Sequence, residues 1–292
     1  MGVTCPPQAN GLSGFVTGLR FGAMHLSTPC WVVSDVHLGA APAAHERDLL
    51  ALLTAAPSRA RSLVVNGDLF EFWFEWRHVI PRVGFRAVAA LAAAHDAGLP
   101  VLFLGGNHDC WGGESLARDS GLTYQLGAWN GTIGAWRAHF DHGDGLRERE
   151  DRGYRVLRAV LRNGLARRAF RLLHPDWGVR LAMATSHTSR NTRPRDGGAG
   201  LRSIALQKLA EQRELDLVVF GHSHVPALER APDGGVYANP GGWLDGPTFL
   251  CIDDTRVSLR RWDGSAEGHC LDVLDRRAEK PLSEAQELRR GV

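Results

Sequence analysis

The sequence has no run of about 18 consecutive apolar residues, which is what a membrane-spanning helix requires. Its five cysteines are scattered, with no CxxC pair, so they indicate no disulfide framework. No basic start leads into an apolar stretch of signal-peptide type. Internal repeats and low-complexity tracts are also missing. These absences together predict a protein of the reducing cytosol.

Charge of one sign is lacking too. The 34 basic and 32 acidic residues leave a formal net charge of +2, which gives no global attraction to nucleic acid. We therefore expect no nucleic-acid partner, and no obligate protein partner is evident. What the chain does have is 292 residues with 44% hydrophobic content, enough to bury one large core or a core with an insertion.

Short aliphatic runs that end in polar clusters alternate with alanine- and leucine-rich stretches of helical type. The expected strands lie at 30–37, 62–68, 100–109 and 215–224, and the expected helices at 45–56 and 84–98. This alternation predicts an α/β layered core. Three later runs, at 234–242, 247–253 and 256–263, have hairpin-like spacing and predict a second sheet with antiparallel pairing.

Residues 151–184 contain no convincing strand and predict a helical insertion. Arg155, Arg158 and Arg162 fall on one helical face, and the opposite face is apolar, with Leu157, Val160, Leu161 and Leu165. Two interpretations stay open at this point. The segment is either a surface helix with solvated arginines, or a lid that offers apolar surface and cations to an acylated, anionic substrate or to a membrane.

These patterns divide the chain into five parts. We expect a loose N-terminal tail, in which Met24 is an alternative start, a core in two parts separated by the insertion, and a charged C-terminal tail with a short helix at 283–290. The corresponding ranges are 1–28, 29–150, 151–205, 206–263 and 264–292.

Acids, amides and imidazoles gather where the predicted strands end. In an α/β sheet the carboxyl ends of the strands deliver side chains into a common crevice. Taken singly, each residue has an ordinary alternative role as a helix cap, a turn residue or a core hydrogen-bonding group. Taken together they predict a metal site. The candidate ligands are Asp35, His37, Asp68, Asn107, His142, His222 and His224.

A mixture of carboxylate, imidazole and amide suits borderline divalent ions such as manganese, iron or zinc. One carboxylate shared by two ions holds them about 3.5 to 4 Å apart, the spacing used in two-metal phosphoryl chemistry. Asp68 is our candidate for the shared carboxylate. If residues 222–224 are extended, His222 and His224 point to the same side, and each can serve one ion.

The ordered motifs "DVH", "GDLFE", "GNHD", "HGDG" and "GHSH" resemble those of the calcineurin-like metallophosphoesterase superfamily. The resemblance implies a sandwich of two mixed β-sheets flanked by helices, here with a helical lid insertion. It also implies two ligand sets that share Asp68. One ion takes Asp35, His37, Asp68 and His224, and the other takes Asp68, Asn107, His142 and His222.

A finer resemblance is to the UDP-2,3-diacylglucosamine hydrolases of lipid A biosynthesis. It rests on the segments 67–76, 142–158, 172–182 and 186–190. It implies cleavage of the diphosphate to UMP and 2,3-diacylglucosamine 1-phosphate, through in-line attack of a metal-bridging hydroxide on the α-phosphorus. It further implies two divalent ions, manganese first and iron or zinc as alternatives, an acylated nucleotide-sugar substrate, and a cytoplasmic protein in peripheral contact with the inner membrane.

Site residues outside the ligand set follow from the same resemblance. His108 stands where the proteobacterial branch has arginine, and we expect it to donate a proton to the leaving oxygen or to hold a phosphoryl oxygen, with Asp109 orienting its imidazole. Arg190, Arg193 and Arg195 are candidates to replace the lysines of that branch. The residues expected to bind substrate are Trp73, Asp151, Tyr154, Ser186, Ser189 and Arg190.

Some alternatives remain at the level of the sequence. The aromatic run at 70–76 is either a substrate wall or internal packing. Asp151 is either a substrate ligand or an acid at a helix N-terminus. A metal centre does not by itself choose the substrate, so a general phosphodiesterase or phosphatase is a second function. A non-catalytic scaffold is a third, and the seven intact candidate ligands count against it.

Overall fold

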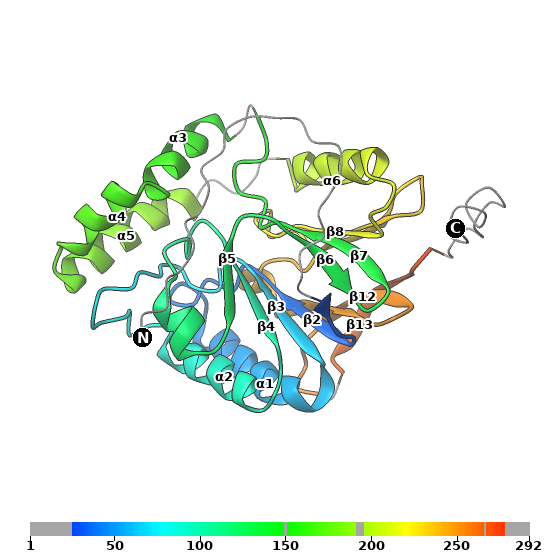
Figure 1. Ribbon diagram of the computed structural model, residues 1–292, viewed down its shortest axis with the longest axis horizontal. Coiled ribbons are helices and arrows are strands. Elements are labelled where there is room, and N and C mark those ends of the chain that lie inside the picture. Colours follow the sequence, from blue (N-terminus) through cyan, green and yellow to red (C-terminus); the bar gives the residue numbers. More distant parts are fainter. Residues whose placement is uncertain (1–24, 149–150, 191–195, 266, 278–292) are drawn as a thin grey trace, which may run out of the picture.

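The computed structural model describes residues 25–148, 151–190, 196–265 and 267–277. Two mixed β-sheets lie face to face, and helices cover their outer sides (Figure 1). The seven-stranded sheet has the order β13 (His269–Asp275), β12 (Arg256–Arg261), β11 (Thr248–Ile252), β2 (Cys30–Val33), β3 (Ser62–Asn66), β4 (Val101–Gly105), β5 (Thr123–Leu126). The six-stranded sheet has the order β1 (His25–Leu26), β6 (Trp129–Ile133), β7 (Trp136–Phe140), β8 (Leu217–Val219), β10 (Val236–Asn239), β9 (Ala227–Arg230). The expected sandwich of two mixed sheets is confirmed.

The strands β2, β3 and β4 are short apolar runs that are buried along their whole length. Such continuous runs suit parallel strands covered on both faces, and β2 to β5 pair in parallel. Helices α1 (Ala43–Arg59) and α2 (Phe85–Asp96) cover the outer face of this sheet. Both coincide with the helices predicted from the sequence. Gly98, with φ +87°, follows the end of α2 as a left-handed residue.

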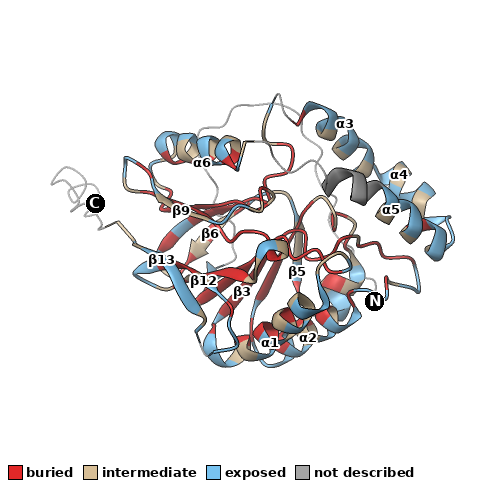
Figure 2. Cartoon of the chain, turned by 180° about the vertical axis from the view of Figure 1, so that it is seen from behind, coloured by how far each residue is buried: buried red, intermediate tan, exposed pale blue. Residues whose placement is uncertain are grey.

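The buried apolar residues form three clusters. Figure 2 shows buried residues in the strands of both sheets. The middle cluster joins the inner faces of the two sheets and includes Val32, Leu102 and Phe140. Helix α6 (Ala199–Glu211) covers the outer face of the six-stranded sheet, where Leu201 and Leu209 join the same cluster as strand residues of that sheet. The buried clusters hold the carboxyl ends of several strands in fixed relative positions.

The three later strands predicted to form a second sheet do not belong to one sheet, so that prediction is wrong. Strand β10 pairs with β8 in parallel and with β9 antiparallel, whereas β11 pairs with β2 in the other sheet. Closeness in sequence favoured a single meander, but the chain crosses from one sheet to the other between Asn239 and Thr248. Strands β5, β6, β7 and β9 were not predicted, and the exposed or half-buried pattern of β5 shows how weak its local signal is.

The predicted tails are shorter than expected. Strand β13 pairs antiparallel with β12 inside the expected C-terminal tail, and β1 pairs with β6 inside the expected N-terminal one. The rest of both tails, including the helix expected at 283–290, lies outside the described residues.

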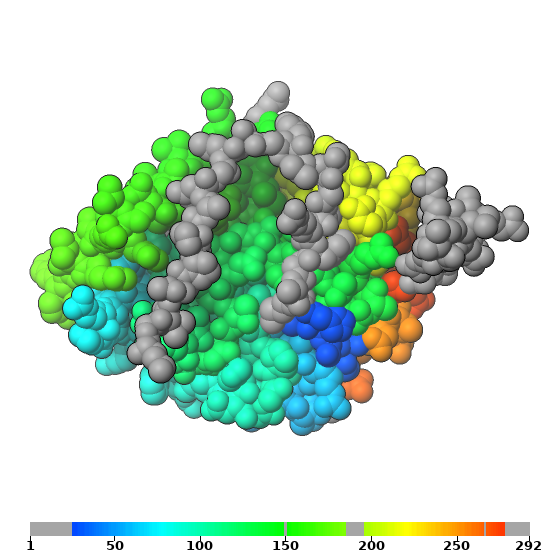
Figure 3. Space-filling view, viewed as in Figure 1, coloured from blue at the N-terminus to red at the C-terminus, as the bar shows by residue number. Residues whose placement is uncertain are grey.

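The insertion consists of α3 (Arg152–Leu161), α4 (Gly164–Arg171) and α5 (Pro175–Arg190), which extend to one side of the sheets (Figures 1 and 3). The predicted boundary at residue 205 falls inside α6. Since α6 packs on a sheet, we propose that the insertion ends before Ala199. Two short turns, η1 (Ser115–Asp119) and η2 (Trp243–Asp245), complete the described elements. Among all the residues that the structure describes, no helix is both long and apolar enough to cross a bilayer.

Candidate metal centre

The loops that leave β2, β3, β4, β7 and β8 meet at one edge of the sandwich, as the sequence predicts. Backbone hydrogen bonds join them to one another. The amide of Asp35 donates to the carbonyl of Gly67 at 3.0 Å, and that of His37 to Asp68 at 3.0 Å. The amide of Gly221 donates to the carbonyl of His142 at 3.0 Å. These bonds tie the loop after β2 to the loop after β3, and the loop after β7 to the loop after β8.

Five of these loop residues have a left-handed backbone, which is costly for residues other than glycine. Among the described residues, every non-glycine residue with positive φ is a predicted metal ligand: Asp35 (52°), His37 (54°), Asp68 (53°), His222 (58°) and His224 (58°). Residues 222–224 are therefore not extended, and that part of the prediction is wrong. Hydrogen bonds between the loops stabilise this unfavourable backbone conformation, which directs the five side chains toward the candidate metal centre.

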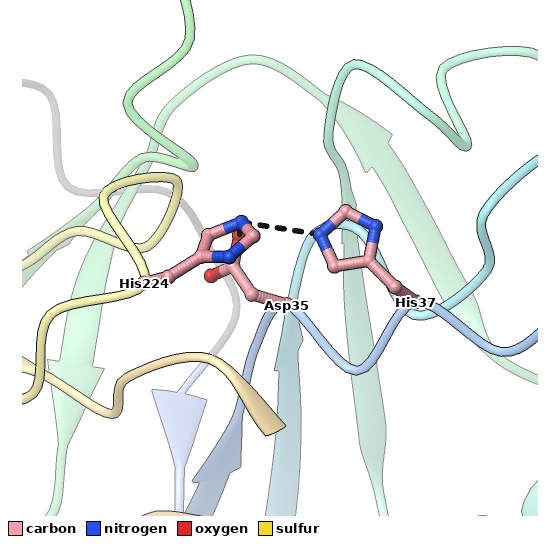
Figure 4. Close-up of side chains that lie close together, drawn as sticks. All are labelled: Asp35, His37 and His224. Carbon is pink, nitrogen blue, oxygen red and sulfur yellow. Dashed lines mark hydrogen bonds and ion pairs between the residues drawn. The ribbon is translucent and has the colours of Figure 1, made fainter. Parts of the chain in front are cut away.

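The first group of donors comes from the loops after β2 and β8. Nε2 of His224 lies 3.3 Å from Oδ1 of Asp35 and 3.2 Å from Nε2 of His37 (Figure 4). The backbone amide of His222 donates a hydrogen bond to the carboxylate of Asp35 and further ties the two loops together. A proton on one of two imidazole nitrogens can join them at this distance. A metal cation between the two nitrogens can take the place of that proton.

The second group lies on the other side of Asp68. Oδ2 of Asp68 is 3.1 Å from Nε2 of His142, and the ring of His142 is 5.3 Å from that of His222. The same Asp68 oxygen lies 3.9 Å from Nε2 of His37, which belongs to the first group. One carboxylate oxygen thus faces both groups, which supports the prediction that Asp68 is shared.

The residues present fit two divalent ions. Oδ1 of Asn107 is buried without a hydrogen-bond partner, a costly state that an ion relieves. Ligand atoms of Asp35, His37 and His224 lie within 4.8 Å of one another, and so do those of Asp68, His142 and His222. Carboxylate, imidazole and amide donors suit manganese, iron or zinc. The structure thus brings the predicted ligands together, and their assignment to two ions stays a prediction.

The electrostatics of the site also favour cation binding. Burial lowers the pKa of His222 and of His224, so both rings are neutral and available as ligands. Burial opposes the ionisation of Asp68, but the neighbouring imidazoles, His142 first, hold its pKa well below the usual range. The shared position is therefore occupied by a carboxylate.

Glycines beside the ligands leave room for them. A Cβ atom on Gly106 would lie 2.2 Å from Oδ1 of Asp68, and one on Gly67 would lie 2.3 Å from Nδ1 of His142. Either contact would displace a ligand. The glycines of "GD" and "GN" in the motifs are thus required by close packing against the centre.

Asp109 does not have the predicted role. Its carboxylate accepts hydrogen bonds from the amides of Gly106 (2.7 Å), Asp68 (3.2 Å) and Leu69 (2.8 Å). It therefore ties the loops that carry Asp68 and Asn107 and does not orient the imidazole of His108. Buried amides need acceptors, and the sequence does not show which amides lack one.

His108 lies at the edge of the centre. Its ring Nδ1 is 2.8 Å from the carbonyl of Glu71, and its Nε2 is 4.0 Å from Oδ2 of Asp68. The backbone amide of His108 donates to Oδ1 of Asp68 at 2.9 Å. Its ring thus stands beside the shared carboxylate and is oriented by a carbonyl group that the sequence analysis did not identify.

Trp73 is not placed to bind substrate. Its side chain is 1% exposed, stacks on Phe70 with 4.3 Å between ring centroids, and donates from Nε1 to Oε1 of Glu75 at 3.2 Å. Packing therefore explains this aromatic residue. Phe74 packs on Phe170 of α4, with ring centroids 4.9 Å apart, and so joins the insertion to the core.

The other residues expected to bind substrate have mixed positions. Asp151 is buried and paired with Arg147, whose Nη2 lies 2.7 Å from Oδ1, and its side chain makes no helix-capping hydrogen bond. Tyr154 lies beside the centre, with its ring 6.4 Å from that of His222. The side chains of Ser186, Ser189 and Arg190 lie outside the described residues, as do Arg193 and Arg195.

The link between α3 and the metal centre was missed. Asp144, two residues after His142, is 1% exposed and accepts a hydrogen bond from the Tyr154 hydroxyl at 2.7 Å. Nε of Arg158 lies 3.2 Å and Nη2 of Arg162 lies 3.7 Å from the same carboxylate. Arg158 of α3 and Arg162, the residue after this helix, are thus paired with a buried acid, whereas Arg155 of the same predicted face is exposed. The interpretation as a helix with solvated arginines therefore fits Arg155 but not the other two. Apolar residues of α3, such as Leu157, are exposed.

Metal removal is expected to destabilise the protein in a pH-dependent way. An ion that binds only the folded chain adds about 2.7 kcal/mol at a hundredfold excess over Kd. Burial lowers the pKa of His37 and of His142, but the nearby carboxylates more than offset it and raise both. Protons therefore compete with the ion for these rings, and affinity falls as pH falls. We expect manganese to raise Tm, EDTA to reverse this, and the gain at pH 6 to be smaller than at pH 8. Equal gains in thermal scans at both pH values would contradict the assignment.

Comparison with known proteins shows the family of this chain. The family model described as "Calcineurin-like phosphoesterase" matches residues 28–226, and the chain belongs to this family. A "UDP-2,3-diacylglucosamine hydrolase" of Porphyromonas gingivalis is 30% identical over 250 residues, covering 78% of this chain and 95% of that protein. One of the same name from Xanthomonas oryzae pv. oryzae is 28% identical over 245 residues, covering 79% and 97%. Among solved structures, a dimetal phosphatase from Danio rerio is similar with a TM-score of 0.45 and 13% identity, covering 85% and 98%.

Proposed function

We propose that this protein hydrolyses the diphosphate of UDP-2,3-diacylglucosamine to UMP and 2,3-diacylglucosamine 1-phosphate, using two divalent ions, with manganese as the first choice. One observation carries the proposal. The buried Asp144, two residues after the candidate ligand His142, pairs with Arg158 and Arg162 of the insertion, and several large apolar side chains of the insertion are exposed. Cations and apolar surface beside a phosphoesterase centre match an anionic, acylated substrate. The relatives named as hydrolases of this substrate support the same choice.

Several large apolar side chains of the insertion are exposed. Exposed apolar side chains that gather on one segment commonly mark a binding surface. Leu172 is 88% exposed and Trp177 is 67% exposed. The other large exposed apolar side chains of this segment are Val156, Leu157, Val160, Leu165, Leu173 and Leu181.

The chemistry divides between the ions and the chain. Bound divalent ions would supply a nucleophilic water near neutral pH and take up charge on the phosphoryl oxygens. The candidate ligands would hold them, with Asp68 between the two groups. His108 donates Nδ1–H to the Glu71 carbonyl, so Nε2 is the ring atom that faces the centre. Nε2 would donate to a leaving or phosphoryl oxygen from the doubly protonated ring, in which both nitrogens carry a proton.

Hydrolysis of UDP-2,3-diacylglucosamine by manganese-loaded protein tests the proposal. UMP release is followed beside bis-p-nitrophenyl phosphate as a generic phosphodiester. Fast, EDTA-sensitive UMP release with little activity on the generic ester is the expected result. Robust generic activity without UMP release would leave a general phosphodiesterase in place of the lipid enzyme. Inactivity on both substrates with ions bound would favour a scaffold.

We also propose a cytoplasmic protein whose insertion contacts the inner membrane. Burying one large apolar side chain contributes about 1.5–3 kcal/mol, so each lost contact weakens binding by about ten- to a hundredfold. The double variant Leu172→Glu/Trp177→Glu should reduce sedimentation with vesicles of phosphatidylethanolamine and phosphatidylglycerol by that order per residue. Leu126→Glu, on β5 and 43% exposed, is the matched control and should bind as wild type. Equal binding of all three proteins would remove the membrane contact from the proposal.

A further inference from the structure

Glu71 is a buried acid whose two ends contact two different histidines. It lies in the loop after β3, is 1% exposed, and its amide donates to the carbonyl of Leu38 at 2.9 Å. Its carboxylate Oε2 is 3.0 Å from Nδ1 of His37. Its main-chain carbonyl is 2.8 Å from Nδ1 of His108. One rigidly held residue therefore occupies the Nδ1 side of both rings.

Occupying Nδ1 determines what Nε2 can do. A ring that donates Nδ1–H to a carboxylate presents an unprotonated and more basic Nε2 as a ligand. Nε2 of His37 lies 3.2 Å from Nε2 of His224 and 3.9 Å from Oδ2 of Asp68. Nε2 of His108 lies 4.0 Å from the same Asp68 oxygen. Both rings are thus turned toward the shared carboxylate.

We propose that Glu71 is the positioning residue of this centre. Its carboxylate sets the tautomer and orientation of the metal ligand His37, and its main chain sets the orientation of His108. Glu71 acts through these two rings and is not itself a metal ligand. The inference rests on the proposed metal centre, and it does not depend on which phosphoester is the substrate.

Direct metal binding by Glu71 is the competing arrangement. Donor atoms of His37, Glu71 and His108 lie within 4.8 Å of one another and could hold an ion of their own. In the structure, however, Nδ1 of His37 and Nδ1 of His108 are both directed at oxygens of Glu71 itself. The two arrangements differ in stoichiometry, with two ions per chain in our proposal and three in the alternative.

Substitution at Glu71 separates charge from geometry. Glu71→Gln keeps an oxygen that can accept the Nδ1–H bond of His37 but removes the negative charge. Glu71→Ala removes both. Loss of such an outer partner typically costs 10- to 100-fold in metal affinity. We expect Glu71→Gln to weaken the manganese site that includes His37 by about tenfold and Glu71→Ala by about a hundredfold, while the site that includes His142 is little affected.

Glu75→Gln is the matched control. Glu75 lies four residues further along the same segment, is 9% exposed, and accepts hydrogen bonds from the amides of Gly113 and Ser115 at 2.9 Å. Within the described part of the chain, the groups that donate hydrogen bonds to its carboxylate belong to Trp73, Gly113, Ser115 and Leu116, and none is a histidine. Glu75→Gln also neutralises a buried acid of this segment. This variant therefore measures the loss of stability that such a substitution causes without a change at a histidine ligand. We expect it to lower the Tm of the metal-free protein and to leave manganese affinity unchanged.

Calorimetric titration of each metal-free variant with manganese, together with its Tm, gives the result. A selective loss of one affinity in Glu71→Gln, with wild-type affinities in Glu75→Gln, is expected. Equal loss in both variants, unchanged affinity in Glu71→Gln, or three ions per wild-type chain would each overturn the inference. If Glu71→Ala does not fold, Glu71→Gln and its control still decide. Because no substrate enters the titration, failure to release UMP would count against the proposed function alone.

Discussion

Replacing Asp68 with alanine is expected to reduce UMP release by more than about a thousandfold, because the two-metal chemistry needs both ions in place. Oδ2 of Asp68 lies 3.1 Å from Nε2 of His142 in one group and 3.9 Å from Nε2 of His37 in the other. No other carboxylate among the described residues stands between the groups in this way. Its removal therefore weakens both sites at once.

Metal content makes this prediction specific. Asp68→Ala should bind at most one manganese ion per chain in equilibrium dialysis, against two for wild type. Asp68→Asn keeps an oxygen but no charge, so its manganese content should lie between those of Asp68→Ala and wild type. Asp216→Asn is the control, since Asp216 is a buried acid that pairs with Arg276 and Arg277 near β8, away from the candidate ligands. An Asp68→Ala protein with two tightly bound ions would refute the shared role.

The ligand positions could be predicted from sequence because their signal is local. Each follows an apolar strand directly, and the carboxyl ends of strands in one sheet meet at one edge. The left-handed backbone of His222 and His224 could not be predicted in the same way. It depends on hydrogen bonds to Asp35 and on neighbouring loops, which lie far away in sequence.

The orientation of α3 shows the limit of amphipathic patterns. The pattern separates Arg158 and Arg162 from Val160 correctly, but it does not show which face meets the core. The apolar face usually does. Here a buried acid, Asp144, draws the arginines inward, because a buried carboxylate without partners would be costly. The apolar face is then left exposed, and this outcome is what supports a role for the insertion in binding acylated material.

Buried partners account for most of the remaining differences. We expected the carboxylate of Asp109 to contact the ring of His108. It instead accepts hydrogen bonds from the backbone amides of Gly106 and Leu69. Trp73 was expected to contact substrate, but its ring fills the core against Phe70. In each case the sequence gives the chemical type of a side chain, and only the packed structure gives its neighbour.

Replacing His108 with alanine is expected to lower kcat about 10²- to 10⁴-fold, the usual contribution of a positioned proton donor or acceptor. Both ions should be retained. The backbone amide of residue 108 donates to Oδ1 of Asp68 at 2.9 Å and survives the substitution, so the variant tests the ring alone. Turnover is to be measured under saturating manganese, with metal content determined on the same sample.

His108→Arg then separates the two roles open to the ring. In wild type, Nε2 of His108 lies 4.0 Å from the shared carboxylate. From this position it can contact either a leaving oxygen or a phosphoryl oxygen beside the ions. An arginine can hold a phosphoryl oxygen but does not give up its proton near neutral pH. If charge on the phosphoryl group is what matters, His108→Arg should recover most of the activity lost in His108→Ala. If proton donation matters, it should remain as slow as the alanine variant. Wild-type turnover in His108→Ala itself would remove the ring from the reaction, and the proton of the leaving group would then have to come from solvent.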